Sequence, residues 1–336
     1  MTAPRVSLAH LPTPIEALPR LSEDIGGANL LVKRDDCTGL AMGGNKARQL
    51  EFYFGDALAQ GADTVLITGA VQSNYVRMTA AAAAKLGMTC HVQLEERVDD
   101  VGVAYRESGN VLLDQLFGAQ IHRFPVGEDD VAADAQLDRF ANELRAAGRN
   151  PYVIHLGLGH PPLGALGYME AAREILEQQH TEQLQIDEII VASGSGQTHA
   201  GLLYGLRTRG SDLPVIGICV RRDQSTQLLR IQDHVSGLDA LTSQADVVCP
   251  DDIVLVDDFL WPSYGLSNGH SETAMLKAAR LEGLIVDPVY TAKSLAGALH
   301  RATQIGAGKS VLYLHTGGTP ALFGYQPEVT ALAANN

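Results

Sequence analysis

The amino-acid sequence predicts an α/β protein in which two lobes, each a mostly parallel sheet covered by helices, pack around one cleft. From residue 46 onward, short apolar runs alternate with turns and helix-like stretches, which is typical of strands in parallel sheets. The chain has 336 residues, of which 46% are hydrophobic, so it can bury two cores. No flexible linker is evident, so we expect the lobes to pack closely.

The smaller lobe is predicted to span residues 47–159. Its expected strands are 64–68, 91–94, 120–124 and 152–156, and its expected helices are 73–86, 110–117 and 132–147. The acidic residues 128–130 suit the positive N-terminal end of the last of these helices.

The larger lobe is predicted to combine residues 1–46 with residues 160–336. Two prolines favour an extended stretch at 11–15, and residues 239–262 show no regular pattern. The expected strands are 29–33, 188–192, 215–220 and 311–314, and the expected helices are 163–178, 198–206, 224–235 and 271–281.

Composition excludes several classes of partner. The formal net charge of −14 disfavours nucleic acid and anionic membranes, so we expect neither as a partner. The four cysteines are far apart, which indicates reduced thiols rather than a disulfide framework or a zinc site. The N-terminus has no long apolar run, and no segment reaches about 18 consecutive apolar residues, so we expect a cytoplasmic protein.

The stretch Gly43-Gly44-Asn45-Lys46 is the strongest candidate for chemistry. A lysine amine attacks a carbonyl only in its neutral form, which desolvation or a nearby cation can populate. The glycines let the backbone approach a flat ring, so Lys46 is a plausible seat for a carbonyl cofactor such as pyridoxal phosphate. The alternative is an ordinary lysine at a helix start.

The loop at residues 193–201 lies between a predicted strand and a predicted helix. Its backbone amides and hydroxyls can face an anion, which predicts a phosphate cradle rather than a plain glycine-rich turn at Gly194, Ser195, Gly196, Gln197 and Thr198. A dinucleotide site is disfavoured because His199 replaces the third glycine of GxGxxG. Arg221 and Arg222 also stand where an acidic ribose ligand is expected, and no Walker A pattern occurs.

Three further places carry candidate site residues. Ser73 and Asn74 follow a strand, where they could bind a substrate carboxylate and a phenolic oxygen or simply cap a helix. Tyr264 and Tyr290 lie in turns and could exchange protons if their environment lowers their pKa, although core tyrosines are commoner. Thr316 follows the last strand and could approach a pyridine nitrogen.

Other chemistry has little support. The histidines show no HExxH pattern, and the nearest pair, His155 and His160, flanks a glycine-rich loop rather than sharing a helix face. We therefore predict no metal site. No GxSxG pattern supports a serine hydrolase.

Six motifs occur together in an order that resembles one family, the D-cysteine desulfhydrases and 1-aminocyclopropane-1-carboxylate deaminases. These are fold-type II pyridoxal phosphate enzymes, related more distantly to the tryptophan synthase β subunit. The likeness runs from about residue 11 to 325 through Lys33-Arg34-Asp35-Asp36, Gly43-Gly44-Asn45-Lys46, Gln72-Ser73-Asn74, residues 193–201, Asp287-Pro288-Val289-Tyr290 and His315-Thr316-Gly317-Gly318.

The resemblance implies pyridoxal 5'-phosphate as cofactor in the cleft, a small amino acid as substrate, and a homodimer. Lys46 would carry the cofactor as a Schiff base, the loop at 194–198 would hold its phosphate, and Asn74 would bind its phenolic oxygen. Ser73 would hold the substrate carboxylate. The substrate face would also include Tyr75, Gly159, His160, Tyr264 and Tyr290.

Thr291 bears on the reaction, because the deaminases have a glutamate at this position that contacts the ring nitrogen. A hydroxyl leaves that nitrogen closer to neutral than a carboxylate does, which favours β-elimination over opening of a cyclopropane ring. Other departures concern the substrate. The loop Gly157-Leu158-Gly159-His160-Pro161-Pro162 is unusual, Gln197 replaces a glycine, Tyr75 replaces a histidine, and His270 replaces an acidic residue.

These features predict a lyase of amino-acid and sulfur metabolism that acts on a small β-substituted alanine. The leading candidate substrate is D-cysteine, which would yield pyruvate, ammonia and sulfide. The alternatives are release of sulfite from cysteate, deamination of 1-aminocyclopropane-1-carboxylate, and a pyridoxal phosphate protein without turnover.

Overall fold

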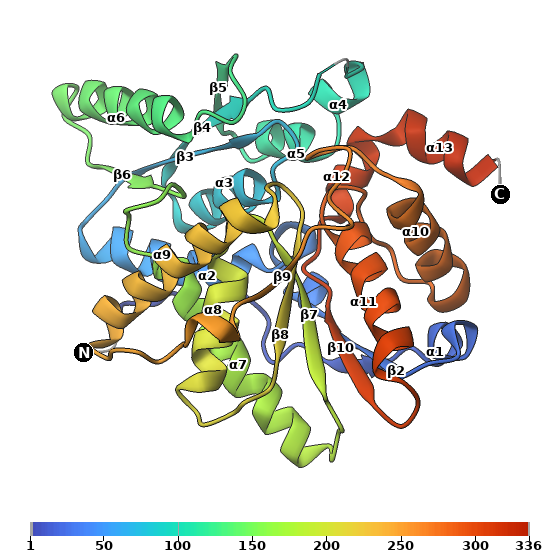
Figure 1. Cartoon of the computed structure of the whole chain (residues 1–336). Helices are drawn as coiled ribbons and strands as arrows, with labels where there is room; N and C mark the ends of the chain where they lie inside the picture. The colour runs from blue at the N-terminus through green and yellow to red at the C-terminus, as the bar shows by residue number, and fades with distance from the viewer. Residues whose placement is uncertain (1–2, 100, 335–336) are drawn as a thin grey trace.

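The computed structural model describes residues 3–99 and 101–334, and their strands form two separate sheets (Figure 1). Residues 1–2 and 335–336, which belong to the predicted larger lobe, and residue 100 of the smaller lobe lie outside the described residues. Each sheet is flanked by helices, so the predicted α/β class with two mostly parallel sheets is confirmed.

The larger sheet has six strands in the order β1-β2-β10-β7-β8-β9. Only the edge strand β1 is antiparallel, to β2; the other neighbours are parallel. The strands are β1 (Ile15–Ala17), β2 (Asn29–Lys33), β7 (Glu188–Ser193), β8 (Val215–Cys219), β9 (Val254–Val256) and β10 (Ser310–Leu314).

The smaller sheet has four strands in the order β5-β4-β3-β6, and all neighbours are parallel. Each strand begins and ends within two residues of its predicted bounds. The strands are β3 (Thr64–Ala70), β4 (Thr89–Glu95), β5 (Gln120–Phe124) and β6 (Pro151–Ile154).

Helices cover both sheets. Figure 1 shows α7, α8 and α9 on one side of the larger sheet and α10 and α11 on the other. The helices are α1 (Pro19–Ile25), α2 (Lys46–Ala59), α3 (Asn74–Leu86), α4 (Val103–Glu107), α5 (Asn110–Leu116), α6 (Asp130–Ala146), α7 (Leu163–Thr181), α8 (Gln197–Arg207), α9 (Gln224–Thr242), α10 (Gly269–Glu282), α11 (Thr291–Ile305), α12 (Thr319–Gly324) and α13 (Gln326–Ala334).

Several helices differ from the prediction, because α1, α4, α11, α12 and α13 have no counterpart among the predicted helices. Helix α9 continues to Thr242, seven residues past the predicted end at 235. Helix α11 was not predicted, although its apolar residues gather on one face at the helical spacing. Small residues are needed there, since a Cβ at Gly297 would lie 2.5 Å from Ile218 of β8.

The larger sheet separates two cores. Along β10, Val311 and Tyr313 pack in the core under α10 and α11, whereas Leu312 and Leu314 pack in the core under α7, α8 and α9. This alternation follows from the two-residue period of a strand. Because both faces are buried, the strand reads as a continuous apolar run.

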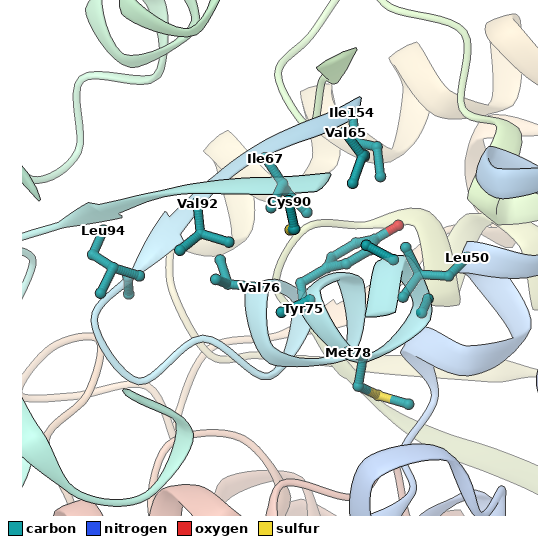
Figure 2. Close-up of a cluster of buried hydrophobic side chains, with 14 of the residues drawn as sticks. Leu50, Val65, Ile67, Tyr75, Val76, Met78, Cys90, Val92, Leu94 and Ile154 are labelled. Atoms are coloured by element: carbon teal, nitrogen blue, oxygen red, sulfur yellow. The ribbon is translucent and has the colours of Figure 1, made fainter. Parts of the chain in front are cut away.

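The smaller sheet packs on α2 and α3 through a third core (Figure 2). In that figure the ring of Tyr75, from the first turn of α3, lies among the apolar side chains of the sheet and of α2. Helix α6 covers the opposite face of this sheet, where Leu137 and Ala141 contact Leu66.

None of the helices in residues 3–99 and 101–334 combines the length and apolar character needed to cross a membrane.

Candidate active site

A cavity of about 980 Å³, part of it open to solvent, lies where the carboxyl ends of strands from both sheets meet. Thr68, Gly69 and Ala70 of β3 and Ala192 of β7 belong to its wall. Ligands of parallel α/β proteins bind beyond these strand ends, because the following loops and helix N-termini converge there. The cavity therefore occupies the position expected of a ligand site.

Lys46 is the first residue of α2 and is partly buried, and its amine differs from those of two completely buried lysines. The Lys33 amine donates to Thr13 O, Glu174 and Gln178, and the Lys293 amine donates to Leu260 O and Ser263 O. Within the described residues no acceptor receives a hydrogen bond from Lys46, which lines the cavity with its amine 4.8 Å from the centre of the Tyr75 ring. Burial lowers the pKa of Lys46 to about 7, so its amine is partly neutral at physiological pH.

The turn before Lys46 requires its glycines. Gly43 has φ 73° and Gly44 has φ 129°, and a Cβ at Gly43 would lie 1.7 Å from Asp36 O. The Thr38 hydroxyl accepts from Gly44 N and donates to Gly44 O, both at 2.8 Å. The turn is thereby fixed, and α2 begins with Lys46 at the cavity.

The loop that carries Gly194, Ser195 and Gly196 forms another part of the cavity wall, at the N-terminus of α8. Gly196 has φ 93°, and a Cβ there would lie 2.7 Å from the His234 ring. A side chain at position 196 would therefore collide with His234, which packs against the loop from α9. Exposed amides at a helix start attract anions, so this wall suits a phosphate group.

Thr198 also faces the cavity, and its hydroxyl accepts two hydrogen bonds, from Asn45 Nδ2 at 2.9 Å and from Gln49 Nε2 at 2.7 Å. A hydroxyl that already accepts two bonds has its proton left to donate. The neighbouring Gln197 side chain is directed away from the loop and donates to the Tyr53 hydroxyl at 2.8 Å, so it does not line the cavity.

Ser73 and Asn74 both line the cavity at the N-terminus of α3. The Ser73 hydroxyl accepts from Val76 N at 3.3 Å, so Ser73 is the N-cap, one of the two roles the sequence suggests. Tyr75 contributes its ring to the cavity, while its hydroxyl is buried without a hydrogen-bond partner.

Tyr264 and Tyr290 meet at the cavity, where their hydroxyl oxygens are 2.6 Å apart. Burial raises the pKa of both phenols, although the Arg97 charge opposes the shift at each of them. Both phenols are therefore neutral at physiological pH and suited to donating protons. The lowered pKa on which the sequence argument depended does not occur.

The two threonines proposed near the ring nitrogen lie in different surroundings. Thr316 lines the cavity. Thr291 is completely buried, and its hydroxyl donates to Asp287 Oδ2 at 2.6 Å and accepts from Asp287 N at 2.7 Å. Thr291 is not part of the cavity wall.

Gly159 and His160 do not line the cavity, whereas Leu156 and Gly157 just before them do. His160 stacks on His155 with ring centres 4.1 Å apart, and both lie beside Asp134 of α6. These three residues offer ligand atoms within 4.8 Å of one another. However, a metal ion binds in the plane of an imidazole, and two rings stacked within 7° of parallel have planes that do not meet at one ion.

Several charged cavity residues were missed by the sequence analysis. Glu95 ends β4 and accepts from Thr68 and Arg97, and Asp130 begins α6 and accepts from Arg221, Arg222 and Arg230. Arg222 does not line the cavity, whereas its wall includes Thr68, Glu95, Arg97, Asp130, Arg221 and Arg230. Their position in the sequence was the available signal, because Glu95 is the last residue of β4, and Arg97 and Arg221 lie two residues past the ends of β4 and β8.

Comparison with known proteins gives consistent relatives. Residues 6–317 match the family described as pyridoxal-phosphate dependent enzyme. The chain is 45% identical to the D-cysteine desulfhydrase of Salmonella paratyphi A and 44% identical to that of Salmonella typhi. Each alignment covers 331 residues, which is 97% of this chain and 97% of the relative.

Two solved structures resemble the whole chain. A homologue of ACC deaminase has a TM-score of 0.87 and 35% identity, with 98% of this chain and 96% of the other covered. O-ureido-L-serine synthase has a TM-score of 0.67 and 19% identity, with 92% and 90% covered, and this second likeness shows a common fold only.

Proposed function

Because the chain belongs to the family of pyridoxal-phosphate dependent enzymes, we propose that it is a lyase that eliminates the β substituent of a small substituted alanine. D-cysteine is the leading substrate, by analogy with the desulfhydrases that the chain resembles at 44–45% identity. With one water consumed, D-cysteine would give pyruvate, ammonia and hydrogen sulfide.

The cavity residues fit pyridoxal 5'-phosphate. The loop before α8 places the backbone amides of a helix N-terminus at the cavity, and the Thr198 proton is free to bond a phosphate oxygen. Lys46 supplies a buried amine without an acceptor for the cofactor aldehyde. Asn74 would bind the phenolic oxygen, and Thr316 rather than Thr291 would approach the ring nitrogen, because only Thr316 lines the cavity.

The bound cofactor would withdraw electrons from the substrate α-carbon and so acidify its proton. Lys46 would accept that proton, because desolvation keeps its amine partly neutral near pH 7. The N-terminus of α3 would bind the substrate carboxylate through Ser73 and the backbone amides that follow it. The Tyr75 ring lies under the Lys46 amine and limits where that amine can move.

The Tyr264 and Tyr290 pair would protonate the departing β substituent. A thiolate leaves more readily when a neutral phenol donates to it, and burial keeps both phenols neutral. Their short contact lets one hydroxyl support the other as it donates.

The observation that carries this proposal is the buried Lys46 amine without an acceptor, in a cavity shared with a helix-start anion site. The test is an assay for pyruvate and ammonia from D-cysteine, L-cysteine, both cysteates, β-chloro-D-alanine and 1-aminocyclopropane-1-carboxylate. We expect the highest rate with D-cysteine. If cofactor is bound and none of these compounds reacts, the lyase proposal is wrong and the protein binds cofactor without turnover.

Release of sulfite from cysteate is a second candidate, because Arg97, Arg221 and Arg230 line the cavity. Guanidinium groups bind sulfonates as they bind carboxylates and phosphates. Glu95, Asp130 and Asp134 line the same cavity and offset that charge, which favours the neutral thiol of cysteine. If the assay shows faster release of sulfite from cysteate than of sulfide from D-cysteine, cysteate becomes the preferred substrate.

We also propose the lobe division of residues 1–46 with 160–336 and 47–159, and a cytoplasmic homodimer. The strands of the smaller sheet all lie within 64–154, which supports the division. Helix α2 contacts both lobes, with Leu50 in the smaller-lobe core and Arg48 O 2.3 Å from where a Cβ at Gly167 of α7 would lie. Light scattering would measure the oligomeric state.

A further inference from the structure

The two ends of the Asn74 amide are distinguishable. Asn74 Oδ1 faces Arg77 Nη1 at 3.3 Å and Asn110 Nδ2 at 3.1 Å. A guanidinium has only donors, so the atom that faces it must be the amide oxygen. The NH2 end of Asn74 is thereby left for the cavity that Asn74 lines, and no acceptor in the described part of the chain receives a hydrogen bond from it.

The hydrogen bonds of Asn110 fix the orientation of its side-chain amide in the same way. Its Nδ2 donates to Gln72 O at 2.9 Å, and a carbonyl oxygen can only accept. Its Oδ1 then accepts from Arg77 Nη1 at 3.2 Å. The Gln72 side chain is fixed in turn, because its Nε2 donates to Tyr105 O and Ser108 O while its Oε1 accepts from Asn110 N.

Arg77 also reaches the loop that precedes Lys46, since its Nη2 donates to Gly43 O at 2.9 Å. Arg77 is completely buried, and none of the salt bridges in the described residues includes it. Burial lowers the pKa of Arg77 to about 10, which leaves it charged near neutral pH, and burial raises the pKa of nearby Asp114 well above its usual range. The direct hydrogen-bond partners of the guanidinium are neutral oxygens, and the carboxyl groups that act on it from nearby are Asp114 and Asp287.

We propose that Arg77 and Asn110 are positioning residues, which orient the Asn74 NH2 toward the cofactor and place a buried positive charge behind that amide. This inference rests on the proposed pyridoxal phosphate site and adds two residues outside the cavity wall to it. The charge favours a negative phenolic oxygen on the bound cofactor. Because Arg77 also holds Gly43, it couples the cofactor contact at Asn74 to the turn that presents Lys46.

The test measures the bound cofactor by its visible absorbance, not by turnover. Arg77→Met should weaken cofactor binding about tenfold or more, as expected for loss of a charged hydrogen bond. It should also raise, by about one pH unit, the pH at which the bound cofactor changes its absorbance, because a cation favours the deprotonated form. Arg77→Lys should restore the pH midpoint of the absorbance change more than the cofactor affinity. A lysine keeps the positive charge but cannot bond Asn74 and Gly43 O at the same time as the two Nη atoms of arginine do.

A double-mutant cycle with Asn74→Ala separates this role from a merely structural one. If Arg77 acts through the amide, Arg77→Met should shift the pH midpoint much less in the Asn74→Ala background than in the native one. Arg173→Met, on the exposed face of α7, is the matched control and should change neither value. Circular dichroism checks folding, and Asn110→Ala replaces Arg77→Met if that variant does not fold.

The outcomes separate the two proposals. A native protein that binds no pyridoxal phosphate contradicts the proposed function. A native protein that binds it, together with an Arg77→Met or Asn110→Ala variant that folds and keeps both the affinity and the pH midpoint, overturns the positioning role alone. Equal pH shifts in both backgrounds of the cycle would also overturn it.

Discussion

At the scale of single residues, the reactivity of the site depends on which polar side chain has no hydrogen-bond partner. Lys33 and Lys293 are completely buried and Lys46 is partly buried, but only the Lys46 amine has no acceptor among the described residues and faces the cavity. A desolvated amine without a carboxylate has nothing to stabilise its charged form. Its reactivity therefore follows from burial alone.

The rate of cofactor capture should follow the Lys46 pKa. Protonation below pH 7 removes the nucleophile, so the rate at which apo-protein gains visible absorbance from added pyridoxal phosphate should rise with pH and level off above a midpoint near 7. Stopped-flow absorbance on both sides of pH 7 measures it. A rate that keeps rising toward the ordinary lysine pKa of 10.5 would contradict the burial argument.

Loss of one phenol should affect turnover more than binding. We expect Tyr290→Phe to lower kcat with the best substrate about 100-fold, the usual scale of general acid catalysis, with cofactor affinity unchanged. Tyr152→Phe is the control, because the Tyr152 hydroxyl donates to Asp56 and Tyr152 does not line the cavity. An unchanged kcat in Tyr290→Phe would remove this tyrosine from the mechanism.

Sequence reasoning found the residues that stand in recognisable local patterns and missed those that act through the fold. Lys46 and the loop at Gly194 can be recognised from their glycines, because a positive φ angle is a property of the local backbone that favours glycine. Arg77 looks like any helix residue in the sequence. Its role exists only because Asn110 and Gly43, 33 and 34 residues away, meet its guanidinium.

At the scale of elements, a buried ion network seats α2, the helix that Lys46 begins. Arg48 of α2 makes two hydrogen bonds to Asp35 and two to Glu174 of α7, and Lys33 of β2 also contacts Glu174. The motif around Lys33 and Asp35, which contributed to the family resemblance, therefore supports the helix rather than the cavity. This function of the motif could not be read from its residues, because Glu174 is about 140 residues away.

Arg48→Met should destabilise the protein by about 3–5 kcal/mol, because it leaves two buried carboxylates without their main partner. Arg173→Met on the surface of α7 should cost at most about 1 kcal/mol, since its partner Glu177 is exposed to solvent and its partner Glu170 is partly exposed. Urea unfolding of both variants measures the difference. Equal losses in the two would show that the network adds nothing beyond a surface pair.

At the scale of the whole molecule, charged side chains join the two sheets across the cavity. Asp130 of α6, which covers the smaller sheet, pairs with Arg221, Arg222 and Arg230 beside the larger sheet. These arginines hold the pKa of Asp130 well below its usual range, so the pairs persist through acidic conditions. The predicted order of strands and helices gave both sheets, but it could not place α6 opposite α9.

Asp130→Ala should loosen this connection without unfolding either core. We expect faster amide hydrogen exchange in residues 221–230 and a several-fold faster loss of cofactor, because three guanidinium groups lose a shared partner. Asp129→Ala, which removes only the N-cap of α6, is the neighbouring control. Exchange in residues 221–230 that matches the native protein would show that the pairs do not hold the two sides together.

The most direct test of the account is the site of covalent attachment of pyridoxal phosphate. Borohydride reduction of the loaded protein, followed by peptide mass spectrometry, should place the pyridoxyl group on Lys46, and Lys46→Ala should lose both the label and the yellow colour. Label on Lys33 or Lys293, which are also buried, or colour that survives in Lys46→Ala, would contradict the account.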